Sequence, residues 1–214
     1  MLRERTRAVH LQAERSGVVR EILRGRASRD GYGLFLRNLL PAYRALERGL
    51  ETHRQMPGVA AFTHPALYRV AGLESDLRGL CGPNWRRELP VLSAGRSYAR
   101  RITRVAVGEG TRLIGHAYAR YLGDLSGGQI LARLLGRSLG LGPGTLAFYD
   151  FPDIPDADGF KAELRAALDW AAPLLADPEA VVDEALCAFR LNIALSEAVE
   201  AAAAPAGGRS AVVV

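Results

Sequence analysis

Apolar residues recur every three or four positions along most of the chain, the spacing that places them on one face of a helix. The clearest run contains Leu34, Leu36, Leu39, Leu40, Tyr43, Leu46 and Leu50. Sustained alternation with a period of two, which would indicate strands, is absent. Segments rich in glycine and proline near residues 28, 56, 81, 107, 140 and 150 separate the periodic runs. The pattern predicts an all-α protein of about seven or eight helices.

Two helix starts can be read from their capping residues. Ser28, followed by Asp30, can cap a long helix over about residues 29–55. Asp177 precedes Pro178, and proline fits the first turn of a helix, so the last helix is expected to begin there. No internal repeat or linker divides the chain. We therefore expect one helical domain over residues 1–204 and a disordered low-complexity tail over residues 205–214.

The chain has 214 residues, of which 49% are hydrophobic, enough to form one core. Lys and Arg number 28 against 23 Asp and Glu, a net charge of +5. The arginines are scattered and interleaved with acids, which favours a solvated surface over nucleic-acid binding. A positive face for an acidic protein partner is the other interpretation of this charge.

Cysteine content and hydropathy bear on location. Cys81 and Cys187 are far apart and lack zinc-like spacing with histidine, so we expect two reduced, buried thiols. The charged first ten residues lack the apolar centre of a signal peptide. No apolar run reaches the length of about 18 residues that a membrane span needs. These features predict a cytoplasmic protein that does not insert into membranes.

The stretch "YLGDLSGGQ", residues 121–129, departs from an otherwise helical pattern. Each glycine inside a helix costs about 1 kcal/mol relative to alanine. Gly123 and Gly127 are four residues apart and share a face, which leaves a strip of bare backbone. The strip can serve close helix packing or the approach of a flat ligand, and the glycines also permit a kink. Asp124 beside it is either solvated or partly buried at a functional site.

His10 is a candidate metal ligand. It lies next to Val9 and Ala13 on the apolar stripe of an N-terminal helix, where a histidine is most often a packed boundary residue. Neutral imidazole also binds iron, and Glu14 one turn further is on the same face. Arg3 lies seven residues earlier, about 10 Å along the helix axis. This spacing suits a ligand with a central metal and a peripheral anion.

The other histidines offer weaker candidates. His53 and His64 flank a proline- and glycine-containing break and are expected to be exposed, whereas His116 is expected to be a packed or capping residue. No pair of histidines has the spacing of a zinc or di-iron site.

Longer segments carry a resemblance to a known family. "HAYARYLGDLSGGQ", residues 116–129, resembles the distal helix of heme oxygenases, and "VHLQAE" around His10 resembles their proximal segment. The segments "RDGYGLFL", "YRALE", "GPNW", "LAFYDFP", "FKAELRAAL" and "AFRLNIAL" follow in the family's order. The resemblance extends from about residue 3 to about residue 200. The chain is identified on this basis as a member of the soluble, bacterial-type, biliverdin-producing heme oxygenases.

The resemblance implies a single-domain, all-α fold that holds heme between a proximal helix and a kinked, glycine-rich distal helix. It implies that heme, as both substrate and cofactor, is cleaved at the α-meso carbon to biliverdin, CO and free iron. O2 is consumed, and a reductase or ferredoxin-type donor supplies the electrons. A monomer is expected.

The resemblance also implies site residues. His10 corresponds to the axial ligand of the iron. The distal surface and the proton-delivering network correspond to Gly123, Gly127, Gly128, Asp124, Arg120 and Tyr43. Heme-binding positions correspond to Arg3, Glu14, Tyr118, Ser126, Lys161, Arg165, Phe189 and Asn192. Lys161 is the only lysine in the chain, which agrees with a specific role as a propionate contact.

Three alternatives remain at this point. A heme carrier or sensor without ring-opening activity would share His10 but would not require Asp124 and the glycines together. A thiaminase-like protein of related fold would require a reactive cysteine, and neither Cys81 nor Cys187 lies in a supporting motif. A helical nucleic-acid-binding protein would bind with strong salt dependence.

Overall fold

The computed structural model describes residues 1–204, and within this range it consists of helices, turns and loops without a β-strand. The all-α prediction is confirmed, while the tail predicted over residues 205–214 lies outside the described residues. The α-helices are α1 (Leu2–Glu14), α2 (Gly17–Leu23), α3 (Arg29–Thr52), α4 (Val70–Cys81), α5 (Trp85–Glu88), α6 (Ser93–Val105), α7 (Leu113–Ala117), α8 (Gly123–Ser126), α9 (Gly128–Leu139), α10 (Ala157–Ala171) and α11 (Pro178–Ala203). A π-helical turn, η3 (Tyr118–Leu122), joins α7 to α8. Short 3₁₀ turns are η1 (Ala60–Phe62), η2 (Pro65–Leu67), η4 (Pro143–Thr145), η5 (Ala147–Tyr149) and η6 (Ala172–Leu174).

Both predicted helix starts are confirmed. The Ser28 hydroxyl accepts a hydrogen bond from the Gly31 amide at 3.0 Å, and α3 follows directly. The Asp177 carboxylate accepts one from the Ala180 amide at 2.9 Å at the start of α11. Each cap satisfies one of the amide groups that the first helical turn leaves without a partner.

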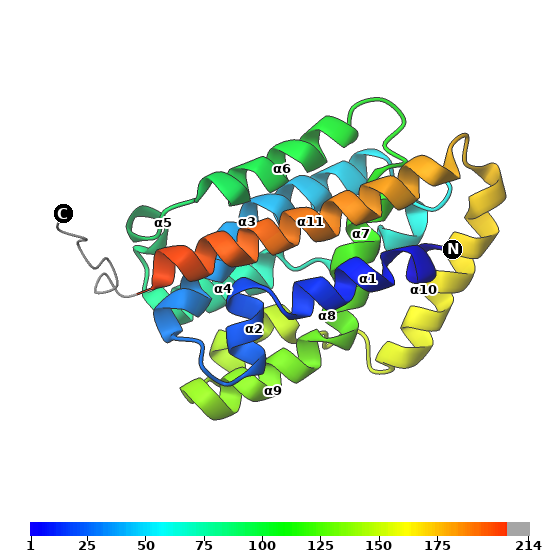
Figure 1. The fold of residues 1–214 in the computed structure, drawn as a ribbon. Coiled ribbons are helices and arrows are strands. Elements are labelled where there is room, and N and C mark those ends of the chain that lie inside the picture. Colours follow the sequence, from blue (N-terminus) through cyan, green and yellow to red (C-terminus); the bar gives the residue numbers. More distant parts are fainter. Residues whose placement is uncertain (205–214) are drawn as a thin grey trace, which may run out of the picture.

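Helix α11 is the centre of the arrangement. It packs against α1, α2, α3, α6 and α7, and α3 packs in turn against α4 and α6. Figure 1 shows α11 and α3 running through the length of the molecule with α1 alongside α11. The main core lies between these helices and buries Leu36, Leu39, Leu40, Leu46 and Leu50 of α3 completely. None of the helices in residues 1–204 is long and apolar enough to span a bilayer.

A smaller hydrophobic cluster joins α1 to the rest of the protein. Val9 and Ala13 of α1 pack there with Ala188, Phe189 and Ile193 of α11, and Ala119 of η3 completes it. The cluster places the helix that carries His10 beside the glycine-rich segment.

Two expectations about polar side chains are corrected by the packing. His53 is half-buried rather than exposed, because its Nε2 lies 2.8 Å from the carbonyl oxygen of Ala106. His64 is exposed, as expected. Cys81 and Cys187 are free thiols as predicted, but both are half-buried rather than fully buried.

A buried ionic cluster links α6, α7 and α11. His116 is completely buried, which confirms it as a packed residue, and its Nε2 lies 2.8 Å from Oε1 of Glu184. Arg101 donates from Nε to the same oxygen at 2.9 Å. Burial raises the pKa of Glu184, but the contacts with His116 and Arg101 outweigh it and lower that pKa from 4.5 to about 2.

The depressed pKa predicts a pH-dependent contribution to stability. The Glu184 carboxylate stabilises the fold fully above its unfolded-state pKa of 4.5, and the contribution is lost as the pH falls toward about 2. Glu184→Gln should therefore lower the free energy of unfolding by about 3 kcal/mol near pH 7 and by much less near pH 3. Urea unfolding at the two pH values measures the difference.

Glu179→Gln, which removes an exposed ion pair with Arg5, is the control and should lower the free energy of unfolding by less than about 1 kcal/mol at either pH. A deficit for Glu184→Gln that does not change with pH would contradict the assignment.

Candidate functional site

The glycine-rich segment is an interrupted helix. Helix α7 continues into the π-helical turn η3, then into α8, and a break at Gly127 precedes α9. A π-turn adds one residue to a helical turn and is frequently found at functional sites. The kink predicted from the glycines is thus present, and it turns the side chains that follow η3 relative to those before it.

A cavity of about 1010 Å³ lies between α1 and the segment η3–α8. This volume is at the upper end of the range for sites that enclose a small molecule. One wall comes from α1, and the facing wall comes from η3 and the start of α8. The lining residues are Met1, Arg3, Glu4, Thr6, Arg7, His10, Leu11, Glu14, Tyr118, Ala119, Leu122, Gly123, Ser126, Arg165 and Phe189.

His10 faces this cavity rather than the core. Its side chain is 48% exposed, and its ring meets the Phe189 ring edge-on with centroids 5.6 Å apart. Its Nδ1 lies 3.7 Å from Oε1 of Glu14, too long for a hydrogen bond but close enough for attraction. Because Glu14 lies beside Nδ1, Nε2 is the ring nitrogen left to bind a metal.

The three glycines of the segment differ in what surrounds them. A Cβ added at Gly123 would meet no atom within 4 Å, and one at Gly127 would meet only the Gly123 carbonyl oxygen, at 3.5 Å. Gly123 therefore presents bare backbone to the cavity that it lines. A Cβ at Gly128 would lie 2.8 Å from Cδ1 of Tyr149. We expect Gly128 on the same surface; the structure shows it buried and packed closely against the Tyr149 ring.

Directly behind the Gly123 wall is a buried polar network. Asp124 is 5% exposed, so the structure decides for a buried rather than a solvated carboxylate. Tyr43 donates its hydroxyl proton to Oδ2 of Asp124, and Arg120 donates from Nη2 to Oδ1 at 3.1 Å. Arg120 also donates from Nε to the Tyr43 hydroxyl at 2.9 Å and from Nη1 to Oδ1 of Asn192 at 2.6 Å. Four residues predicted from the resemblance thus form one connected group.

The environment of Asp124 perturbs its titration. Burial raises the pKa of the Asp124 carboxyl above its ordinary value, and the positive charge of Arg120 and the Tyr43 hydroxyl oppose that rise. The Asp124 carboxyl therefore takes up and releases its proton at a higher pH than a free aspartate does.

Basic side chains gather where α1 meets α10. Arg3 and Arg165 line the main cavity and also a smaller one of about 190 Å³ beside it, and Tyr118 lines both. Lys161 is buried behind this rim instead of lining it. Its Nζ lies 2.7 Å from Oδ1 of Asp158 and donates to the Ser126 hydroxyl at 3.2 Å, and Ser126 lines the cavity.

Sequence reasoning missed two kinds of residue. Arg7 and Leu11 of α1 line the cavity. Helical spacing could have found Arg7, which lies three residues before His10 on the same face. Tyr149 packs on Gly128, and Gln129 donates to the Tyr149 carbonyl oxygen at 2.7 Å. No local sequence pattern predicts these contacts, because they join two segments that a loop separates.

The contrast between the glycines predicts opposite responses to alanine. Gly128→Ala should lower the free energy of unfolding by about 1–3 kcal/mol, because the new methyl group forces the buried Tyr149 ring to shift. Gly123→Ala should leave stability unchanged or raise it by up to about 1 kcal/mol, because the position is open and alanine favours helix. Urea unfolding of both variants measures the difference. Equal destabilisation by both would contradict this packing.

Comparisons with known proteins agree with this geometry. The family model described as heme oxygenase matches residues 1–198. Heme oxygenase 1 of Nostoc sp. is 39% identical over 201 residues, covering 93% of this chain and 84% of the relative. Human heme oxygenase 1 is 40% identical over 200 residues, covering 92% and 69%.

Solved structures show the same likeness. The crystal structure of heme oxygenase-1 from the cyanobacterium Synechocystis sp. in complex with heme has a TM-score of 0.88 and 37% identity, covering 94% of this chain and 91% of that chain. Heme oxygenase from Leptospira interrogans has a TM-score of 0.86 and 33% identity, with coverages of 92% and 97%. The chain therefore belongs to the heme oxygenase family.

Proposed function

We propose that this protein oxidatively cleaves heme to biliverdin, CO and free iron, using O2 and electrons from an external donor. The observation that carries the proposal is the pairing of His10 on one wall of the cavity with the bare backbone of Gly123 on the facing wall. An imidazole can hold iron from one side, while the absence of a side chain leaves room for oxygen on the other.

The cavity fits heme in shape and in chemistry. Ala119, Leu122 and Phe189 provide apolar surface for a flat ring. Arg3 and Arg165 at one rim can form paired hydrogen bonds with carboxylates, as propionates require. A Cβ at Gly123 would project into otherwise open space within the site. The donor set thus matches a ring with a central metal and anionic groups on one edge.

The proximal side binds and orients the ring. His10 would bind the iron through Nε2, with Glu14 beside Nδ1 to favour one orientation of the imidazole. Phe189 supports the imidazole ring from α11. When bound, heme supplies the iron that takes up O2 and the meso carbon that becomes oxidised.

The distal wall would supply protons although no side chain projects into the cavity at Gly123. Asp124 lies next to Gly123 in the chain and holds its carboxylate through Tyr43 and Arg120. A carboxyl with a raised pKa is a suitable general acid, and it would exchange its proton at an Oδ atom with solvent at the Gly123 wall. Asn192 fixes the Arg120 guanidinium from α11 and thereby the whole group.

The basic rim determines which meso carbon reacts, because the propionates fix the rotation of the ring in its plane. Arg3 and Arg165 at the rim and Tyr118 beside them line the same edge of the cavity. Lys161 supports this edge through Ser126. Because Arg3, Lys161 and Arg165 correspond to the propionate contacts of the family, we propose cleavage at the α-meso carbon.

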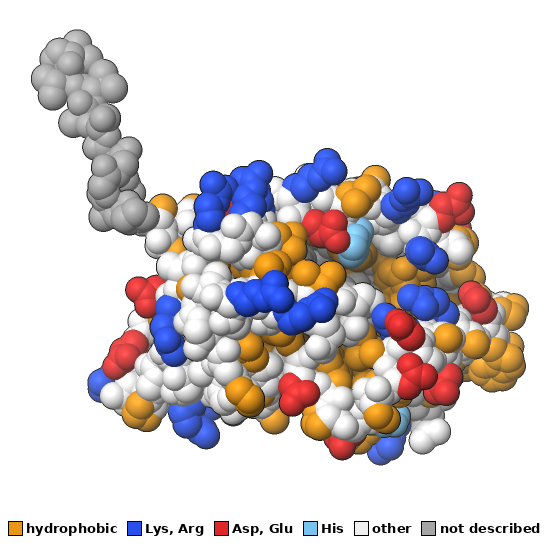
Figure 2. Space-filling view, turned by 90° about the horizontal axis from the view of Figure 1, so that it is seen from below, with side chains coloured by type: hydrophobic (Ala, Val, Ile, Leu, Met, Phe, Trp, Pro, Cys, Tyr) orange, Lys and Arg blue, Asp and Glu red, His pale blue; other side chains and the backbone are white. Residues whose placement is uncertain are grey.

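We also propose a reductase or ferredoxin-type electron donor, a monomeric state and a cytoplasmic location. The net charge of +5 suits an acidic donor. Figure 2 shows Lys and Arg side chains distributed over one face with hydrophobic surface between them, which is compatible with a weak, transient docking surface.

A hemin titration followed by turnover tests the proposed function. We expect a saturable one-to-one complex with a Soret band, and loss of that band with biliverdin absorbance once ascorbate and O2 are added. Chromatography of the product should give the α isomer. A complex whose Soret band survives the reductant would instead indicate a heme carrier or sensor, and mainly β or δ isomers would refute the regiochemical proposal.

Two substitutions separate binding from chemistry. His10→Ala should abolish turnover, because the iron loses its protein ligand, even where hemin still enters the cavity. Asp124→Asn should retain hemin affinity within a few fold and lower the rate of biliverdin formation by about 10²-fold or more, since a general acid is lost. Asp183→Asn, an exposed position on α11, is the matched control and should turn over at the parent rate. Parent-rate turnover by Asp124→Asn would show that the proton comes from elsewhere.

A further inference from the structure

Helix α1 supplies one wall of the cavity and carries His10, yet it lies at the surface of the fold. Only Thr6, Val9 and Ala13 of this helix are buried. It packs against α11 and, at its carboxyl end, near α2. The position of His10 therefore depends on this packing against α11 and on how the ends of α1 are held.

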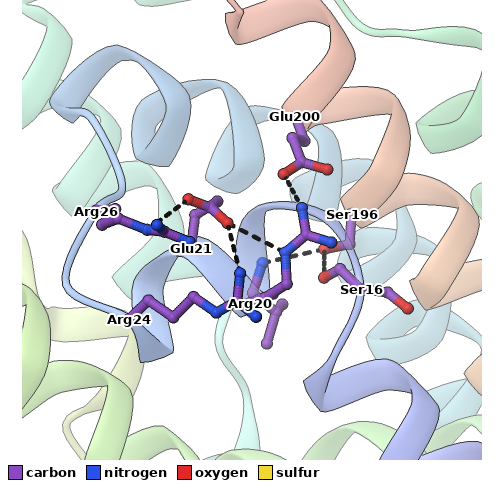
Figure 3. A network of polar contacts seen from close by, with 8 residues as sticks. Ser16, Arg20, Glu21, Arg24, Arg26, Ser196 and Glu200 are labelled. Carbon is purple, nitrogen blue, oxygen red and sulfur yellow. Dashed lines mark hydrogen bonds and ion pairs between the residues drawn. The ribbon is translucent and has the colours of Figure 1, made fainter.

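A serine on α11 holds the carboxyl end. Ser196 is completely buried, and its hydroxyl donates to the carbonyl oxygen of Ser16 at 3.0 Å. The same hydroxyl accepts from the amide of Val19 at 3.1 Å. Figure 3 shows Ser196 facing Ser16 at the junction between α1 and α2. One side chain thus bonds both Ser16, the residue just before α2 at the junction with α1, and the first turn of α2.

The backbone at this junction has little freedom to move. Gly17 has a φ of +53°, and a Cβ added there would lie 2.2 Å from the backbone carbon of Ser196. The left-handed conformation and the absence of space each exclude a side chain. The turn after α1 therefore packs directly against the main chain of α11.

An outer group of charged side chains surrounds the same junction. Arg20 of α2 pairs with Glu200 of α11 and donates to Glu21 at 3.1 Å. Arg26 lies 3.3 Å from Glu21, and all three pairs are visible in Figure 3. These groups are partly exposed, so solvent screens them more than it screens the buried hydroxyl of Ser196.

The amino end of α1 is held by a weaker contact, an exposed ion pair. Arg5 pairs with Glu179 at 3.1 Å, with side chains 47% and 59% exposed. Exposed pairs of this kind contribute little. Apart from the packing of Val9 and Ala13 on α11, helix α1 is therefore fixed chiefly at the junction with α2, where Ser16 lies.

We propose that Ser196 is a positioning residue for the proximal ligand. It fixes the carboxyl end of α1 on α11 and thereby sets the separation between His10 and the Gly123 wall. This role rests on the proposed function, because it matters for catalysis only when His10 binds heme iron. The anchoring itself is a property of the protein without heme.

Hydrogen exchange of the heme-free protein tests the anchor directly. Ser196→Ala leaves the Val19 amide and the Ser16 carbonyl without their partner. Amides of residues 2–14 should then exchange at least about tenfold faster than in the parent, while those of α3 keep their rate. Ser28→Ala is the control, because it removes a serine hydrogen bond at the start of α3 and none at the α1–α2 junction. Unchanged exchange in α1 for Ser196→Ala would overturn the proposal.

Measurements with hemin test the consequence for His10. Ser196→Ala should release hemin to an acceptor protein about tenfold faster than Ser28→Ala and should show a mixture of spin states by electron paramagnetic resonance. Equal release and identical spectra for the two variants would overturn the positioning role. If the parent protein binds no hemin, the proposed function fails, and the exchange experiment still decides whether the anchor exists.

A milder variant covers the case in which Ser196→Ala does not fold. Glu200→Gln removes the charged contact with Arg20 at the same junction. It should raise exchange in α1 by about threefold. Glu74→Gln, which removes a partly exposed contact with Arg44 between α4 and α3, is its control and should leave α1 unchanged. The same α1 exchange rate in these two variants would overturn the proposal.

Discussion

The distal side of this cavity depends on the buried ion pair between Arg120 and Asp124. Two charges in a protein interior are tolerated only when their remaining hydrogen-bonding groups find partners, and here Tyr43 and Asn192 supply them. The pair bridges the π-helical turn into α8, so its geometry is tied to the course of the backbone at Gly123. The same contacts that satisfy the charges therefore keep both side chains off the cavity surface and leave the main chain exposed there.

Helix α11 connects this distal group to the proximal side. Phe189 contacts His10, Asn192 contacts Arg120, and Ser196 holds the end of α1. These three residues follow helical spacing, so one stripe of one helix serves both walls of the site. A long helix in the centre of the core is a rigid support. It fixes the positions of the two cavity walls relative to each other, although the walls come from distant parts of the chain.

The sequence predicted the helical fold, the two capped helix starts, the kink and, through the resemblance, the family. These are local or strongly patterned features: capping side chains act within one turn, and glycines disrupt a helix where they occur. Sequence could not separate Gly128 from Gly123, because only the approach of Tyr149 distinguishes them. It likewise left Asp124 undecided between solvent and core, since burial depends on Tyr43, which lies 81 positions away in the chain.

A crystal structure of the protein with hemin would show directly whether the ring lies between His10 and the Gly123 wall. We expect Nε2 of His10 bound to the iron and the backbone of Gly123 facing the opposite side of the ring, with the propionates at Arg3 and Arg165. Iron bound by another residue, or a side chain between the iron and the distal backbone, would contradict it.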